Sequence, residues 1–251
     1  MDIRARLALV FAVLAFALPV QAQDGNVAMA YFVTTDLANA VQLEEGMRDH
    51  VAWHAQQNDP WPGMVYQAMH GGVEYVWVSS NHTWADFDNP PVDTQADMAD
   101  FADRAGSHVT SLDVRTWVTW ADQSIPPAAD AVVPIWQVIE WDFDNTAEGY
   151  QAVRAAFGKV RGALEQQGGP FRYTVNEVLG IDAAPQLFVA IAHQSMSEMD
   201  GGGPGALERL LAEAYGHADA VQIVRTFEKY LTPTASRFWV LRPDLSHMPG
   251  M

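Results

Sequence analysis

The sequence contains the stretch Trp117-Val-Thr-Trp-Ala-Asp-Gln-Ser124, and the stretch Trp239-Val-Leu-Arg-Pro-Asp-Leu-Ser246 lies 122 positions later. In both stretches a Trp-Val pair is followed at the same spacing by an Asp and then a Ser. Self-similarity at a fixed offset indicates an internal repeat. We therefore expect a chain built from two related halves, each of which ends in this motif.

Further matches lie upstream of the two motifs, at smaller offsets. They are Glu45-Gly46 with Glu148-Gly149, Tyr66 with Tyr173, and His82 with His193. The offset grows along the chain, as expected when insertions are confined to loops. We predict a first repeat over residues 23–123, a linker over 124–133 that contains Pro126-Pro127, and a second repeat over 134–251.

Each half shows the same order of local signals: strand, long helix, two strands, helical region, strand. Capping patterns at Asn39 and Asn145 predict the starts of the long helices, Asp93 starts a shorter one, and Gly168 stops the second long helix. Runs of aromatic and β-branched residues predict strands over 28–35, 64–70, 75–81, 135–143, 171–179 and 187–192. Further helices are expected over 206–215 and 218–231.

A βαββαβ order is the ferredoxin-like arrangement, in which helices cover one face of an antiparallel sheet. Two such units in tandem can cover each other's bare faces. This order resembles the dimeric α/β-barrel superfamily, which includes antibiotic-biosynthesis monooxygenase-like, haem-degrading, chlorite dismutase-like and NIPSNAP-like proteins. The resemblance implies an α+β fold of two tandem ferredoxin-like repeats packed sheet to sheet as a pseudo-dimeric α/β barrel, and it carries no function by itself.

The N-terminal residues 1–22 have the features of a cleavable signal peptide. Arg4 and Arg6 precede an apolar run from Leu7 to Val20, which is too short to span a bilayer, and Ala22 ends an acceptable cleavage site. The alternative is an uncleaved membrane anchor. We expect a periplasmic or secreted protein that starts near Gln23, without a membrane anchor.

The composition excludes several classes of function. A net charge of -17 disfavours nucleic acid and anionic membranes as partners. The absence of cysteine excludes disulfides and cysteine catalysis. The sequence also lacks a Gly-x-Ser-x-Gly elbow, a Walker-type phosphate loop and a dinucleotide fingerprint. The acidic residues Asp86, Asp88, Asp93, Asp97 and Asp100 are expected to form a solvated face.

Two histidines lie on the expected buried face of the first long helix. The second long helix, which we call the sister helix, carries Val153 and Phe157 at the positions where this helix carries His50 and His54. His-x-x-x-His places two imidazoles on one helical face, a spacing that can share a metal ion such as zinc or copper, and haem iron accepts a single axial histidine. Candidates for a third ligand are His82, His70, Asp59 and Asp86. The alternative is a pair of histidines with satisfied hydrogen bonds in the core.

Polar and aromatic residues follow this helix and the third strand. They include Asn58, Trp61, His82 and Trp84. The resemblance implies that such Asn, Trp and His side chains hold an aromatic substrate and a reactive oxygen species in cofactor-independent monooxygenases. We therefore assign catalytic roles to His54, Asn58 and His82 and ligand contacts to His50, Trp61 and Trp84. The alternative interpretation is that the tryptophans anchor loops and that Asn58 is a turn residue. His108, His217 and His247 are expected on the surface.

These features predict an exported small-molecule-binding protein, with an oxygenase or haem-linked oxidoreductase as the reaction class to test first. Its partner would be a small apolar or aromatic molecule held in the first repeat. The cofactor is left open between none, a haem and a transition metal, and formation of a homo-oligomer is also left open. The alternatives are a non-catalytic binding or assembly module and a periplasmic metal-binding protein.

Overall fold

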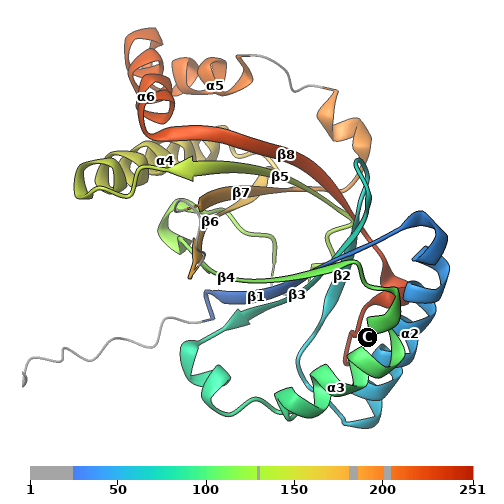
Figure 1. The fold of residues 1–251 in the computed structure, drawn as a ribbon. Coiled ribbons are helices and arrows are strands. Elements are labelled where there is room, and N and C mark those ends of the chain that lie inside the picture. Colours follow the sequence, from blue (N-terminus) through green and yellow to red (C-terminus); the bar gives the residue numbers. More distant parts are fainter. Residues whose placement is uncertain (1–24, 129–130, 181–185, 201–204, 251) are drawn as a thin grey trace, which may run out of the picture.

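The computed structural model describes residues 25–128, 131–180, 186–200 and 205–250 (Figure 1). The expected signal peptide, residues 1–22, lies outside the described residues. The first half consists of β1 (Val27–Thr35), α2 (Ala40–Gln56), β2 (Met64–Ala68), β3 (Val73–His82), α3 (Thr94–Arg104) and β4 (Ser111–Thr119). The second half consists of β5 (Ile135–Phe143), α4 (Ala147–Gln167), β6 (Arg172–Leu179), β7 (Gln186–His193), α5 (Ala206–Tyr215), α6 (His217–Tyr230) and β8 (Leu231–Leu241). None of the described helices has the length and apolar character needed to cross a bilayer.

The strands form one closed antiparallel barrel in the order β1-β3-β2-β8-β5-β7-β6-β4. Each half contributes the same local order, β4-β1-β3-β2 in the first and β8-β5-β7-β6 in the second. The halves join edge to edge, because β2 pairs with β8 and β4 pairs with β6. Helices α2 and α3 lie outside the barrel on one side and α4, α5 and α6 on the other (Figure 1). The predicted fold class, a pseudo-dimeric α/β barrel, is confirmed.

Strand alternation separates three hydrophobic cores, because successive side chains point to opposite faces of a sheet. On β2 and β3, Val65 and Tyr75 pack with residues of α2, whereas their neighbours Tyr66 and Val76 pack in the barrel interior. The third and largest cluster lies between the second half of the sheet and α4 to α6. Each helical layer therefore has its own core, and a further set of apolar side chains meets inside the barrel.

The repeated Trp-Asp-Ser motif forms the two junctions between the halves. After β4, the Ser124 hydroxyl donates to the Trp120 carbonyl at 2.8 Å and accepts from the Val175 amide of β6 at 2.9 Å. After β8, the Ser246 hydroxyl donates to the Arg242 carbonyl at 2.8 Å and accepts from the Val65 amide of β2 at 2.8 Å. Each serine thus binds its own turn to a strand of the other half.

The aspartates of the motif make equivalent contacts with the long helices. Asp122 accepts from Arg154 of α4 at 2.6 Å, and Asp244 accepts from Arg48 of α2 at 3.1 Å. Both contacts again link one half to the other. We call these two sets of contacts, centred on Asp122 with Ser124 and on Asp244 with Ser246, the crossed clasps.

Several local expectations need correction. Asn39 and Asn145 do not cap the long helices: the Asn39 side chain makes no cap hydrogen bond, and Thr146 instead accepts from the Gly149 amide. The match of Tyr66 with Tyr173 is wrong as a structural equivalence, because Tyr66 lies in the barrel interior and Tyr173 under the helices. A slip of one residue exchanges the two faces of a strand. Asp93 does cap α3, and Gly168 ends α4 at a φ of 65°.

Candidate functional site

Helices α2 and α3 approach each other closely at Gly46. A Cβ atom at this position would lie 2.5 Å from the Arg104 carbonyl oxygen and 2.9 Å from the Cα of Ala105. Real Cβ atoms do not approach backbone this closely, so the crossing requires glycine. The approach brings the polar face of α3 against the two histidines one and two turns further along α2.

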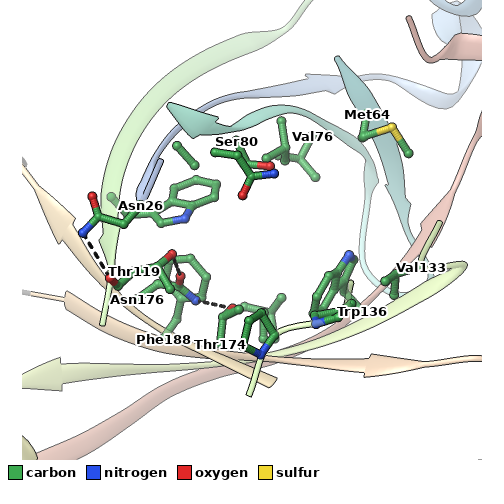
Figure 2. A pocket seen from close by; sticks show the side chains of 18 of the residues that line it. Asn26, Met64, Val76, Ser80, Thr119, Val133, Trp136, Thr174, Asn176 and Phe188 are labelled. Atoms are coloured by element: carbon green, nitrogen blue, oxygen red, sulfur yellow. Dashed lines mark hydrogen bonds between the residues drawn. The ribbon is translucent and has the colours of Figure 1, made fainter. Parts of the chain in front are cut away.

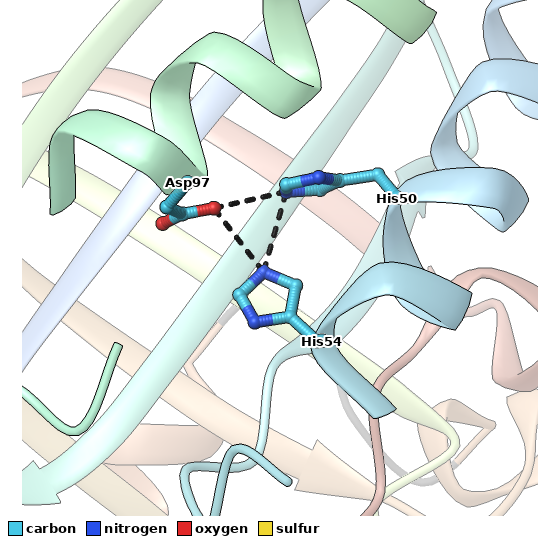
Figure 3. Close-up of side chains that lie close together, drawn as sticks. All are labelled: His50, His54 and Asp97. Atoms are coloured by element: carbon cyan, nitrogen blue, oxygen red, sulfur yellow. Dashed lines mark hydrogen bonds and ion pairs between the residues drawn. The ribbon is translucent and has the colours of Figure 1, made fainter. Parts of the chain in front are cut away.

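His50, His54 and Asp97 meet in the space between the two helices (Figure 3). The Asp97 Oδ1 atom lies 3.2 Å from His50 Nε2 and 3.3 Å from His54 Nε2. The two Nε2 atoms are themselves 3.3 Å apart. Three potential ligand atoms therefore form a nearly equilateral triangle, and only Asp97 was not among the residues that the sequence singled out for ligation.

One further carboxylate binds the far side of each imidazole. Asp100 lies 2.9 Å from His50 Nδ1, and Asp59 lies 2.8 Å from His54 Nδ1. Each is fixed in turn, since Arg104 Nε donates to Asp100 at 2.8 Å and the Trp61 amide donates to Asp59 at 2.9 Å. We call His50, His54, Asp59, Asp97 and Asp100 the histidine–aspartate cluster.

Aromatic rings pack around the two histidines of this cluster. Trp77 of β3 lies 5.7 Å from the His50 ring and 5.3 Å from the His54 ring, measured between centroids. Phe101 packs against the His50 ring, and Trp53 packs against both histidine rings. Both histidines are buried. Because the site is partly dry, its charges interact more strongly than they would at the surface.

The electrostatic balance within the cluster favours charge separation. Burial lowers the pKa of His54, but hydrogen bonds and negative charge from Asp97 and Asp59 outweigh burial, so the net shift of its pKa is upward. Burial raises the pKa of Asp97. Hydrogen bonds from His50 and His54, together with their positive charge, have a larger opposite effect, so the net shift takes the pKa of Asp97 well below its usual range. These interactions therefore favour the protonated form of His54 and the ionised form of Asp97.

Two expectations about the surroundings are wrong. Asp97 and Asp100 do not belong to a solvated acidic face, because both are turned toward the histidines on α2. His247 is buried, not on the surface: its ring stacks on His54 at 5.5 Å and its Nε2 binds the Asp59 carbonyl at 2.9 Å. The crossing of α2 and α3 places Asp97 and Asp100, and the return of the C-terminal segment places His247. Local sequence patterns predict neither arrangement.

The remaining candidate ligands are engaged elsewhere. Asp86 accepts from the Thr83 amide and hydroxyl at the start of a short 3-10 helix. His70 is exposed near the Phe238 ring. Asp59 binds the Nδ1 atom of His54, on the side away from the triangle of the two Nε2 atoms and Asp97. His82 bonds through Nε2 to the Ser79 hydroxyl at 2.7 Å. Asp97 is thus the third residue that the structure brings to the two histidines.

A second aromatic group surrounds His82. The Trp61 and His82 ring centroids are 4.1 Å apart, and Phe87 packs against both. Burial lowers the pKa of His82. Trp84 lies at the edge of this group and is 55% exposed. Asn58 is exposed in the turn after α2, with a φ of 56° and a side chain directed to the Gln56 carbonyl. The structure therefore brings Trp61 to His82, but it does not bring Asn58 or Trp84 to the histidine–aspartate cluster.

The barrel encloses a cavity of about 900 Å³ (Figure 2). Its wall is mainly apolar and aromatic, with Trp117, Trp136, Trp239, Phe32, Phe188 and Tyr66 among the lining residues. Linker residues Pro126 and Pro127 and the prolines of the 59–62 segment also contribute. The described residues that line it include neither His50, His54 nor His82. The predicted histidine site and the cavity are therefore separate.

A few polar groups face this cavity. Arg115 and Glu140 lie 3.9 Å apart, and the Arg115 guanidinium lies 4.6 Å from the centroid of the Phe32 ring. The buried Asn176 accepts from the Thr119 hydroxyl at 2.7 Å and donates to Thr174 at 2.9 Å. The cavity thus combines aromatic walls with fixed polar positions. No sequence pattern pointed to it, because its walls come from strands of both halves.

No family model matches the sequence, and a search of curated proteins finds no significant match. Among solved structures the chain is similar to an anthrone oxidase-like protein at 16% identity and a TM-score of 0.57, with 92% of this chain and 96% of that one covered. It is also similar to a candidate monooxygenase from Lactobacillus acidophilus at 9% identity and a TM-score of 0.52, covering 90% and 97% of the two chains.

A third similar structure is a chlorite dismutase variant from Candidatus Nitrospira defluvii, at 13% identity and a TM-score of 0.53, with 88% and 94% of the two chains covered. At such identities the similarity shows the fold. The resemblance to dimeric α/β-barrel proteins that was expected from element order is therefore confirmed at the level of the fold.

Proposed function

We propose that the protein binds a small, apolar or aromatic molecule inside its barrel. The observation that carries this proposal is the cavity of about 900 Å³, with its aromatic wall and few polar groups. Cavities of this size and composition are typical small-molecule sites. The rings of Trp117, Trp136 and Trp239 offer face and edge contacts to a planar ligand, while Arg115 and Glu140 can orient a polar substituent.

Calorimetric titration with 2-naphthol as a planar aromatic probe tests this proposal. We expect saturable binding at one molecule per chain. Ala190 lines the cavity, so Ala190→Phe should weaken binding about tenfold, since overpacking costs about 1–3 kcal/mol. Leu112→Phe is the matched control, because Leu112 is partly exposed on β4 and does not line the cavity. Equal affinity of the unmodified protein and Ala190→Phe would contradict binding inside the barrel.

The names of two structural neighbours favour a second candidate function, the oxidation of an aromatic molecule by dioxygen. Anthrone is the probe: its methylene carbon takes one oxygen atom as a carbonyl, and its two hydrogens leave with the other oxygen as water. Oxygen uptake above the uncatalysed rate, with one O₂ consumed per anthrone, supports this function. Uptake equal to the uncatalysed rate contradicts it.

Under this second function the residue roles expected from the sequence remain proposals. His54, Asn58 and His82 would act as acid, base or hydrogen-bonding groups, and His50, Trp61 and Trp84 would contact the substrate. His82→Gln should then abolish oxygen uptake. His193→Gln is the control, since His193 is a buried histidine at the end of the corresponding strand β7. Loss of uptake in both variants would indicate a shared structural role instead.

We also propose that residues 1–22 direct export. The support is the sequence pattern of basic residues, a short apolar run and Ala22. Expression of the full chain in a bacterial host should give protein outside the cytoplasm whose N-terminus is Gln23. Protein that keeps Met1 and remains in the cytoplasm would exclude export.

A further inference from the structure

We propose that His50, His54 and Asp97 bind one divalent transition-metal ion. The donors are the two Nε2 atoms and Asp97 Oδ1, which lie 3.2 to 3.3 Å from one another. Three metal bonds of about 2.0 Å at tetrahedral angles place their donor atoms about 3.3 Å apart. The triangle in the protein already has this size. An ion held by all three atoms therefore requires no rearrangement of α2 or α3.

The hydrogen bonds around the triangle make the same case independently. Ionised carboxylates only accept hydrogen bonds, so Asp100 and Asp59 receive the Nδ1 hydrogens of His50 and His54. In the neutral imidazoles, both Nε2 lone pairs then point to the centre, together with the lone pairs of Asp97. Three converging acceptors repel one another unless a cation lies between them. A proton can occupy part of this space, and a metal ion satisfies all three.

Carboxylates bonded to the distal nitrogen of metal-binding histidines are a recurrent part of metal sites, where they fix the ring and increase its basicity. Here both histidines have such a partner, and both partners are themselves held by Arg104 and by the Trp61 amide. A buried imidazole is satisfied by one partner at each ring nitrogen. Here the partners at the two Nδ1 atoms orient both Nε2 atoms toward one point.

The donor set also selects the class of ion. Two imidazoles and one carboxylate suit zinc and iron(II), and a protein without cysteine offers no thiolate for softer ions. Three protein ligands leave coordination positions for water or a small molecule. A haem fits poorly, because a porphyrin ring around iron at either Nε2 atom would collide with the other imidazole and with Asp97. The arrangement therefore favours a single ion.

This inference is independent of the proposed barrel ligand, since the described lining of the cavity includes none of the three ligands. Protein treated with chelator should bind one Zn²⁺ per chain in calorimetry, with release of protons from the cluster. One equivalent of Co²⁺ should produce a visible d–d absorption band, and Zn²⁺ should remove it. Thermal unfolding should shift upward with added Zn²⁺, because the ion binds the folded state.

The variants distinguish ligation from structure. His50→Val with His54→Phe copies the residues of the sister helix, so it should fold and lose at least about 100-fold in Zn²⁺ affinity. Asp97→Asn keeps the side-chain shape and should lose a similar amount, while Asp100→Asn should lose about 10- to 100-fold. His217→Ala is the control, because His217 is exposed on α6. The proposal is overturned if the chelator-treated protein binds neither ion at one per chain, or if the double variant binds Zn²⁺ as tightly as the unmodified protein.

Discussion

Glu44 is the residue that connects α2 to the segment after β8. Its carboxylate accepts from Arg242 at 2.6 and 2.8 Å, from the Tyr75 hydroxyl at 2.6 Å and from Arg48 at 3.0 Å. These bonds, above all those from Arg242, lower the pKa of Glu44 to about 2 despite its partial burial. The pKa of Asp244, which shares Arg242 and Arg48, is also lowered to about 2.

This network makes stability depend on pH in the acid range. The folded pKa of Glu44 lies below its ordinary value of 4.5, so its contribution to stability is fully present above about pH 4.5 and is lost as the pH falls toward 2. Glu44→Gln should therefore lower the free energy of unfolding at pH 7 by about 1–3 kcal/mol and flatten its decline between pH 4.5 and 2. Urea unfolding at a series of pH values measures this. Glu165→Gln, which removes only an exposed helical ion pair, should leave the profile unchanged.

The sequence predicted the two imidazoles of the histidine–aspartate cluster but not its carboxylates. His50 and His54 are recognisable because helical spacing puts them on one face, where the sister helix carries Val153 and Phe157. The positions of Asp97 and Asp100 depend on how α3 crosses α2, which no pattern within either helix encodes. Asp59 resembled an ordinary turn residue because a helix-ending segment favours Asp for local reasons.

At the scale of elements, the crossing of α2 and α3 depends on one glycine. Gly46→Ala should destabilise the protein by about 1–3 kcal/mol, because its Cβ would meet the backbone of α3. Gly158→Ala on α4 is the opposite case: apart from its own stretch of helix, no atom lies within 4 Å of its Cβ position, and alanine should stabilise that helix by about 0.8–1 kcal/mol. Guanidinium unfolding compares the two. The explanation fails if both substitutions change stability in the same direction.

The same elements show why the sequence predicts the positions of the strands more accurately than their pairing. Alternating and β-branched runs predict where β5 and β6 lie to within a residue, because they reflect burial of one strand at a time. The pairing of β2 with β8 and of β4 with β6 depends on contacts between residues far apart in the chain. The expected cap of α4 was wrong by one residue, because Thr146 and not Asn145 accepts the capping hydrogen bond from the Gly149 amide.

At the scale of the whole molecule, we expect the crossed clasps to make the two halves unfold as one cooperative unit. Each serine satisfies a buried strand amide of the other half, so Ser124→Ala and Ser246→Ala should each cost about 1–3 kcal/mol by leaving that amide unpaired. Calorimetry of the unmodified protein should show a single transition, with the van't Hoff and calorimetric enthalpies equal. Two separate transitions would show that the halves unfold independently. Ser195→Ala, in an exposed turn, should change stability little.

The segment from Asp59 to Pro62 belongs to both of the places where we expect a ligand. Asp59 orients His54, while Pro60 and Pro62 form part of the cavity wall. If a molecule in the barrel moves this segment, it changes the affinity of the histidines for a metal ion, and thermodynamic linkage requires the ion to change the affinity for that molecule by the same factor. Calorimetric titrations of Zn²⁺ with and without saturating 2-naphthol, and of 2-naphthol with and without Zn²⁺, measure that factor twice. Two equal factors different from one would show that the two sites are coupled. The occupancy of each site would then change the affinity of the other.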